Sequence, residues 1–178
     1  FLRELEGISR YQAAVSGRPR QLALLHVGRN DAAGYFYYVM ELADAAAADV
    51  RDGLAGDMPV RAPATVNPES YRPRTLRSDL GRHRRLPTAD CLRLALDIVG
   101  GLSQLHRHDL VHRDVKPSNI IFVAGRAKLA DIGLVTTLGE GRTFVGTEGY
   151  IPPEGPGTRV ADVYALGMSI YELMAGKL

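Results

Sequence analysis

Residues 112–119 read HRDVKPSN, and three of them carry chemically active side chains: Asp114, Lys116 and Asn119. The motif follows the strongest helical pattern of the chain, over 88–107, with Thr88 as its expected N-cap. One face of this helix is predicted from the three- and four-residue steps between Leu92, Leu96, Val99, Leu102 and His106. A short apolar run that predicts a strand comes directly after the motif. We therefore expect the three side chains to lie on one loop between a helix and a strand.

A further carboxylate, Asp131, follows a predicted hairpin of two short strands, 120–123 and 127–130. A short hairpin brings its two ends together, so Asn119 and Asp131 can converge on one hard cation through oxygen ligands, as Mg²⁺ prefers. Asp114 then lies nearby as a proton acceptor, and Lys116 as a point charge for phosphate. A carboxylate, magnesium ligands and a lysine are the groups that phosphoryl transfer requires.

These residues resemble the signature of a protein kinase catalytic domain. HRDVKPSN resembles the catalytic loop, and DIG at 131–133 takes the place of the magnesium-binding DFG motif. GTEGYIPPE at 146–154 resembles the end of the activation segment, and DVYALG at 162–167 resembles the helix that anchors the larger lobe. YYVMELA at 37–43 resembles the hinge that holds adenine. Chance is a poor explanation, because the motifs recur in the family's order along almost the whole chain.

The resemblance implies an α+β, two-lobed kinase-like fold with an incomplete small lobe, made of a helix and antiparallel strands, and a mostly helical large lobe. Residues 1–43 would form the remainder of the small lobe and the hinge, and 44–178 part of the large lobe. Within the large lobe, 44–75 is rich in Ala, Gly and Pro and is interpreted as an insert or linker, while 110–154 holds the catalytic loop and activation segment. The apolar patterns outside the central motif predict two helices and two strands, over 1–15, 162–174, 22–28 and 35–40.

The resemblance also implies a role for each residue of the catalytic site. Asp114 would accept or orient the proton of the substrate hydroxyl, and Lys116 would neutralise the migrating phosphoryl group. Thr147 resembles the threonine that hydrogen-bonds both side chains, and Asn119 and Asp131 would hold Mg²⁺. A lysine two residues after the catalytic aspartate is typical of the serine/threonine class.

ATP would bind between the lobes. By resemblance, Glu41 and Ala43 would offer backbone groups to adenine, with Met40 as the gatekeeper beside it and Ile121 packed on its lower face. Glu4 would pair with the lysine that positions ATP.

Glu6 is the alternative to Glu4 for this pairing. Glu4 is preferred because Ile8 follows it by one helical turn, where a residue of the buried column between the lobes belongs. The column would contain Ile8, Leu24, Ile132 and His112.

Regulation is expected at the activation segment. Arg113 resembles the arginine that reads a phosphorylated activation loop, and Thr136, Thr137 and Thr143 are the candidate phosphorylation sites. Asp162 would brace the backbone of the catalytic loop.

The resemblance therefore implies a bacterial-type, cytoplasmic serine/threonine protein kinase that transfers the γ-phosphoryl group of ATP to Ser or Thr hydroxyls of protein substrates, with Mg²⁺. Two rival functions stay open. A pseudokinase or ATP-binding scaffold commonly lacks one of the catalytic residues, which are all present here. A small-molecule phosphotransferase, such as an aminoglycoside kinase, usually lacks the Lys-Pro pair after the catalytic aspartate.

Composition excludes several other classes. The 178 residues are 46% hydrophobic and 24% charged, which is globular rather than disordered or fibrous. A net charge of +2 does not indicate nucleic-acid binding, and no apolar run is long enough to span a membrane, although a longer parent protein could contain one. The lone Cys91 excludes an internal disulfide and is interpreted as a buried packing residue.

Because the sequence begins at Phe1 and contains neither a glycine-rich loop nor the ATP-positioning lysine, we expect a piece of a longer kinase that is inactive by itself.

Arginine dominates the basic residues, since only Lys116, Lys128 and Lys177 are lysines. One local run of six arginines follows the hinge: Arg72, Arg74, Arg77, Arg82, Arg84 and Arg85. It is either a solvated helix face or a docking patch for acidic or phosphorylated substrate segments.

Overall fold

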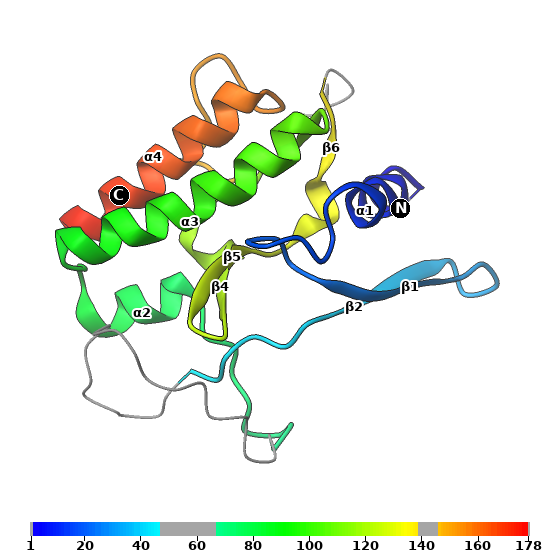
Figure 1. Ribbon diagram of the computed structural model, residues 1–178, viewed down its shortest axis with the longest axis horizontal. Coiled ribbons are helices and arrows are strands. Elements are labelled where there is room, and N and C mark those ends of the chain that lie inside the picture. Colours follow the sequence, from blue (N-terminus) through cyan, green and yellow to red (C-terminus); the bar gives the residue numbers. More distant parts are fainter. Residues whose placement is uncertain (1, 47–66, 139–145, 178) are drawn as a thin grey trace.

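The computed structural model describes residues 2–46, 67–138 and 146–177. Its elements fall into two groups (Figure 1). A helix α1 (Leu2–Ala14) and an antiparallel hairpin of β1 (Leu24–Asn30) and β2 (Tyr35–Met40) lie on one side. Among the described residues, three helices and a second hairpin lie on the other, so the expected α+β architecture with a small and a large part is confirmed.

The large part is built around two helices, α3 (Thr88–Arg107) and α4 (Arg159–Ala175), which run side by side. The shorter α2 (Leu76–His83) precedes α3. The hairpin of β4 (Ile120–Val123) and β5 (Arg126–Leu129) packs against α3, with Ile120 opposite Leu129. This packing places the ends of the hairpin, where the site residues lie, next to the helical core.

Four short elements connect these parts. The strand β3 (Leu110–Val111) pairs antiparallel with β6 (Thr136–Thr137), and 3₁₀ turns η1 (Pro117–Asn119) and η2 (Ile132–Leu134) flank the second hairpin. α1 packs against η2 and β6, which links the small part to the segment after Asp131.

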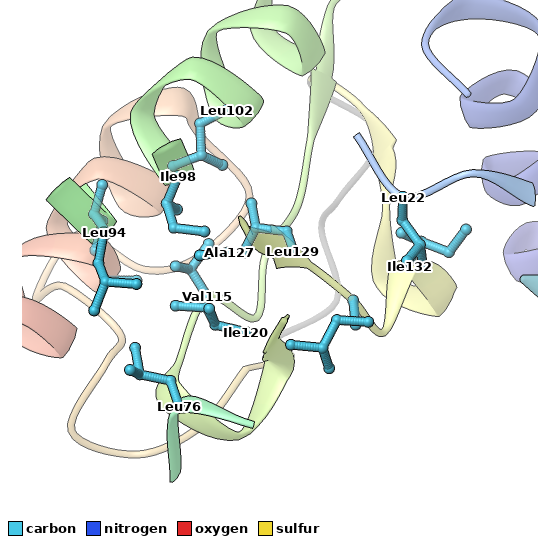
Figure 2. Close-up of a cluster of buried hydrophobic side chains, with 14 of the residues drawn as sticks. Leu22, Leu76, Leu94, Ile98, Leu102, Val115, Ile120, Ala127, Leu129 and Ile132 are labelled. Carbon is cyan, nitrogen blue, oxygen red and sulfur yellow. The ribbon is translucent and has the colours of Figure 1, made fainter. Parts of the chain in front are cut away.

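A single hydrophobic cluster fills the large part and reaches the small one (Figure 2). Side chains from α2, α3, the 112–119 loop and the β4–β5 hairpin converge in it, as the labelled residues show: Leu76, Leu94, Ile98, Leu102, Val115, Ile120, Ala127 and Leu129. Leu22 and Ile132 lie together at its far side, near the small part. The loop that carries Asp114 is therefore anchored in the core by its own Val115.

The predicted bounds of α3 are correct, but of its predicted apolar face only Leu102 is buried. Leu92, Leu96 and Val99 are 60%, 68% and 46% exposed, whereas the helix buries the neighbouring set of Cys91, Leu94, Ile98, Leu102 and Leu105. The helix carries apolar residues on two faces, and the β4–β5 hairpin and α4 cover only one of them. The N-cap is Pro87 rather than Thr88.

The connection over 44–75 is anchored at both of its ends, although 47–66 lie outside the described residues. Isolated bridges pair Ala45 with Pro73 and Thr75 with Ile121. The Asp44 carboxylate accepts hydrogen bonds from the backbone N–H groups of Ala124 and Gly125, at 2.9 and 2.8 Å. Both ends of the connection are thus fixed to the β4–β5 hairpin.

Within the three described ranges, no helix has the combined length and apolarity needed to cross a bilayer.

Candidate active site

A carboxylate of α4 forms hydrogen bonds with the backbone of the loop over 112–119. Asp162, 2% exposed, accepts hydrogen bonds from the backbone N–H groups of His112 (2.9 Å) and Arg113 (2.8 Å). His106, in the last turn of α3, places Nε2 at 2.9 Å from the same carboxylate. Arg113 has a positive φ of 74°, a backbone conformation that non-glycine residues seldom adopt. The expected bracing of the loop by Asp162 is therefore present as two backbone hydrogen bonds, and His106 ties the same carboxylate to α3.

Above this support, four predicted site residues form one network around Asp114. Its Oδ2 atom lies 2.7 Å from Lys116 Nζ and 2.7 Å from Asn119 Nδ2, and its Oδ1 atom accepts from Thr147 Oγ1 at 2.7 Å. Lys116 Nζ also donates to Thr147 Oγ1 at 2.7 Å. Thr147 comes from a distant segment, so the fold itself brings the network together.

This network keeps Asp114 ionised. Burial by itself raises the pKa of a carboxyl group, but hydrogen bonds from Lys116, Thr147 and Asn119 and the lysine charge outweigh burial, so the pKa of Asp114 is lowered. An ionised carboxylate that accepts hydrogen bonds from several partners is a weak base, but it can still accept a further hydrogen bond. At neutral pH it can orient a hydroxyl group that approaches it.

Asn119 and Asp131 lie at the same end of the β4–β5 hairpin. The backbone N–H of Ala130 donates to the Asn119 carbonyl at 2.8 Å, and Asp131 follows directly, exposed and with a positive φ of 56°. Because Nδ2 of Asn119 donates to Asp114, its Oδ1 atom is the oxygen that can face a cation. No hydrogen bond joins Asp131 to the Asp114 network among the described residues.

The donor set suits Mg²⁺ better than a transition metal. Within the described part of the chain, no group of three or more His, Cys, Asp or Glu could hold a metal ion. An amide oxygen and a carboxylate fit a hard cation that takes its other ligands from water and phosphate, as Mg²⁺ commonly does in proteins.

His112 packs as a neutral core residue. It is fully buried, burial lowers its pKa, and its Nε2 lies 3.0 Å from the Ala130 carbonyl. The other expected members of the column, Ile8, Leu24 and Ile132, are buried as well. Isoleucine at the second position of DIG therefore has the packed environment expected there.

The hinge residues lie between the two parts of the structure. Met40 ends β2, Glu41 follows with its backbone N–H bonded to the Ala23 carbonyl at 3.0 Å, and Ala43 is buried with its carbonyl accepting from Tyr71 Oη at 2.9 Å. Ile121 of β4 is buried in the facing hairpin.

A contact that the sequence reasoning missed connects the hinge to the large part. Lys128 Nζ lies 2.5 Å from Glu41 Oε1, which also accepts from the Ala23 N–H at 2.8 Å. Lys128 pairs with Ile121 across the β4–β5 hairpin, so its side chain shares a face with that residue. The sequence offers one indication of a role for Lys128, because lysine is rare here: Lys128 is one of only three lysines in an arginine-rich chain.

A second missed cluster joins three segments that are far apart in the sequence. The buried Glu172 of α4 accepts from the two terminal guanidinium nitrogens of Arg77 in α2, Nη1 and Nη2, the latter at 3.0 Å, and from Tyr150 Oη at 2.5 Å. Burial and then the neighbouring Glu172 raise the pKa of Tyr150 to about 12. Tyr150 belongs to the predicted activation segment, which this cluster ties to two helices.

The remaining predicted residues lie around α1 and β6. Glu4 is exposed on α1, while Glu6 forms an ion pair with Arg10 at 2.6 Å. Arg10 also donates to the Thr137 hydroxyl in β6. Thr136 is partly buried in the same strand, and Thr143 lies outside the described residues.

Comparison with known proteins identifies the family of this chain. A family model described as the protein kinase domain matches residues 65–178, well over half of the chain. The chain is 37% identical over 119 residues to the serine/threonine-protein kinase PknA of Corynebacterium glutamicum, covering 61% of this chain and 25% of the relative. It is 38% identical over 112 residues to PknL of Mycobacterium tuberculosis, also a serine/threonine-protein kinase, covering 57% and 28%. The chain thus spans about a quarter of the length of these bacterial relatives.

Proposed function

The chain belongs to the protein kinase domain family, and from this premise we propose that it is the central part of an ATP- and Mg²⁺-dependent serine/threonine protein kinase. The observation that carries the proposal is the network in which Lys116, Thr147 and Asn119 all hydrogen-bond Asp114. The names of its bacterial relatives support the serine/threonine class.

In the proposed reaction, the hydroxyl oxygen of a Ser or Thr side chain attacks the γ-phosphorus of ATP, and the bond to the bridging oxygen breaks to release ADP. Asp114 accepts a hydrogen bond from that hydroxyl and receives its proton as the new bond forms. Because the pKa of Asp114 is lowered, we assign its main effect to orientation, which suffices when the transition state is loose. Lys116, 2.7 Å from Asp114, places its charge where the phosphoryl group crosses.

Asn119 and Asp131 are proposed to hold Mg²⁺, which when bound would neutralise charge on the phosphate oxygens. Asn119 is pre-oriented for this role, because its Nδ2 atom donates to both the carbonyl and the carboxylate of Asp114, at 2.9 and 2.7 Å. The same amide therefore couples the cation site to the group that orients the acceptor.

The nucleotide is proposed to lie against the hinge. The Ala43 carbonyl already accepts from Tyr71, so its amide N–H is the group that we expect to meet adenine, together with the Glu41 carbonyl. Met40 would border the ring and Ile121 would pack beneath it. Glu4 on α1 is proposed to pair with an ATP-positioning lysine.

Control by phosphorylation is proposed at the activation segment. Arg113 would bind a phosphate on Thr136, Thr137 or Thr143. Thr137 has the clearest local support, because Arg10 already hydrogen-bonds its hydroxyl and could pair with a phosphate placed there.

The test is phosphoryl transfer by the full-length protein with ATP and Mg²⁺. We expect incorporation into Ser or Thr residues of protein substrates, loss of at least about a hundredfold in kcat for Asp114→Asn, and no change for Asp31→Asn, an exposed carboxylate paired with Arg29. ATP binding without any transfer would indicate a pseudokinase and overturn the proposal. Transfer to an aminoglycoside but not to protein would favour a small-molecule phosphotransferase.

We further propose that the protein works in the cytoplasm, where ATP is available, and that the 178 residues by themselves are inactive, because they contain no glycine-rich loop and no upstream ATP-positioning lysine. Autophosphorylation by the isolated 178-residue chain would contradict the second statement.

A further inference from the structure

Two members of the arginine run that follows the hinge are held by contacts within the fold. Arg74 forms an ion pair with the buried Asp79 at 2.8 Å and lies 4.1 Å above the Phe122 ring, and Arg77 is bonded to Glu172. These two arginines are occupied by structural contacts. A docking patch would therefore have to be formed by the arginines at the other end of α2.

Arg84 and Arg85 form the turn between α2 and α3, and both are exposed. A third cation reaches the same place from far along the chain. The backbone N–H of Leu86 donates to the carbonyl of Leu173 in α4 at 2.8 Å, and a Cβ on Gly176 would lie 2.6 Å from the Arg84 carbonyl oxygen. Gly176 has a positive φ of 79° and ends α4 against this turn, so the exposed Lys177 follows beside the two arginines.

We name Arg84, Arg85 and Lys177 the basic corner. It lies where α4 ends next to the start of α3, on the side of the molecule away from α1 (Figure 1). Among the described residues, no carboxylate forms an ion pair with any of the three. The carboxylates of α2, of the first turn of α3 and of the last turns of α4 pair with other arginines: Asp79 with Arg74, Asp90 with Arg93 and Glu172 with Arg77.

The three positive charges of the basic corner are more than is needed to balance the negative ends of the neighbouring helix dipoles. The C-termini of α2 and α4 both end at the corner, and each carries a partial negative charge of about one half. Three full positive charges exceed these two half charges by about two. The corner therefore presents a net positive surface to solvent.

We propose that the basic corner is a docking site for an acidic segment of the protein substrate, which rests on the protein kinase function proposed above. The position of α2 supports this proposal. The helix packs against η1, its N-cap Thr75 pairs with Ile121 just after η1, and its last residue precedes Arg84. Eight helical residues span about 12 Å. An extended peptide needs about four residues to cover that distance, so the acidic residues would lie at least about four positions from the phosphorylated hydroxyl.

Two of the three cations are arginines, whose planar guanidinium groups bind carboxylates through paired hydrogen bonds. This favours a peptide carboxylate or phosphate over an anionic membrane, which attracts any cation.

The direct test is binding of a fluorescein-labelled peptide of eight glutamates to the full-length protein, followed by fluorescence anisotropy at about 50 mM salt, where surface charges are weakly screened. We expect Arg84→Glu/Arg85→Glu to weaken binding about tenfold. The matched control is Arg18→Glu/Arg29→Glu, which makes the same charge change at exposed positions on the small part. It should stay within about twofold of the unmodified protein.

Equal losses in both double variants, or no loss in either, would overturn the proposal. Vesicles with about 30% phosphatidylserine provide the competing arm, and binding to vesicles but not to the peptide would identify a membrane surface instead.

Kinetics give a second readout. Acceptor peptides with four glutamates placed six residues from the acceptor should have a lower KM than peptides with them two residues away, and Arg84→Glu/Arg85→Glu should remove that difference while kcat stays the same. An unchanged difference in the variant would overturn the docking site. Complete absence of phosphorylation would instead refute the proposed kinase function, and the anisotropy measurement would still decide the docking site.

Discussion

Replacement of Asp162 by Asn is the sharpest single test of how the catalytic loop is held. The carboxylate accepts from the His112 and Arg113 backbone N–H groups and from His106, and it is almost fully buried. Asn has nearly the same shape but exchanges one acceptor oxygen for an NH₂ donor. In either orientation of the amide, at least one donor of the loop or of His106 then faces another donor.

The size of the effect follows from these contacts. A buried donor left without an acceptor costs about 1–3 kcal/mol, and the surviving bonds lose the strengthening that a charged acceptor provides. Together these changes predict a loss of about 3 kcal/mol in the free energy of unfolding. That corresponds to a Tm about 6–12 °C lower for a domain of 150–250 residues.

Hydrogen exchange locates the effect. In the full-length protein, the His112 and Arg113 amides should exchange about a hundredfold faster in Asp162→Asn, since each 1.4 kcal/mol is a factor of ten. Asp31→Asn is the matched control, because that side chain is 66% exposed and, among the described residues, pairs with Arg29 alone. If both amides kept their protection and Tm fell by less than about 1 °C, the bracing role would be refuted.

Three further predictions concern glycines and the Asp114 network. Gly7→Ala should destabilise the fold by about 1–3 kcal/mol although alanine favours helices, because its Cβ would lie 2.0 Å from the Val135 carbonyl oxygen. Gly81→Ala on α2, with open space around it, should instead stabilise the fold by up to about 1 kcal/mol. Thermal unfolding that showed both variants stabilised, or both destabilised, would contradict this packing. Thr147→Val removes a hydrogen bond that lowers the pKa of Asp114, so the acid limb of the kcat profile should move to higher pH, and an unmoved limb would count against the network. Because folding lowers the pKa of Asp114, the ionised side chain stabilises the fold fully above the unfolded pKa of about 3.9, and this stabilisation is lost as pH falls through the folded pKa. The difference in unfolding free energy between Asp114→Asn and the unmodified protein, measured by urea unfolding, should therefore shrink below about pH 4. A difference that grew there would contradict the lowered pKa.

The Asp114 network could be predicted from sequence because most of it is local. Asp114, Lys116 and Asn119 share one loop, so their proximity needs only the correct reading of a helix before it and a strand after it. Asp131 required one more step, the hairpin, which alternating short apolar runs around Gly125 indicate. The bounds of α3 were predictable for a related reason, since a strong helical period over twenty residues is insensitive to tertiary context.

Features that depend on which surfaces meet were beyond such reasoning. The two apolar stripes of α3 look equivalent in sequence, and only the position of the β4–β5 hairpin and α4 selects the one that is buried. The strands β3 and β6 have two residues each, too few to show any period. Ion pairs such as Glu41 with Lys128 join residues 87 positions apart, and no local pattern specifies such partners.

The arginine run shows what three-dimensional context adds to function. As a sequence it is one stretch of charge, yet Arg77 is bound to a buried carboxylate while Arg84, one helix length away, faces solvent next to Lys177. A single rigid helix thus separates the basic corner from the catalytic loop by a fixed distance. An acidic segment held at the corner would raise the local concentration of its neighbouring hydroxyl near Asp114 without changing the groups that act on it. For this reason the docking site should affect KM and leave kcat alone, whereas any change at Asp162 that disturbs the loop should lower kcat.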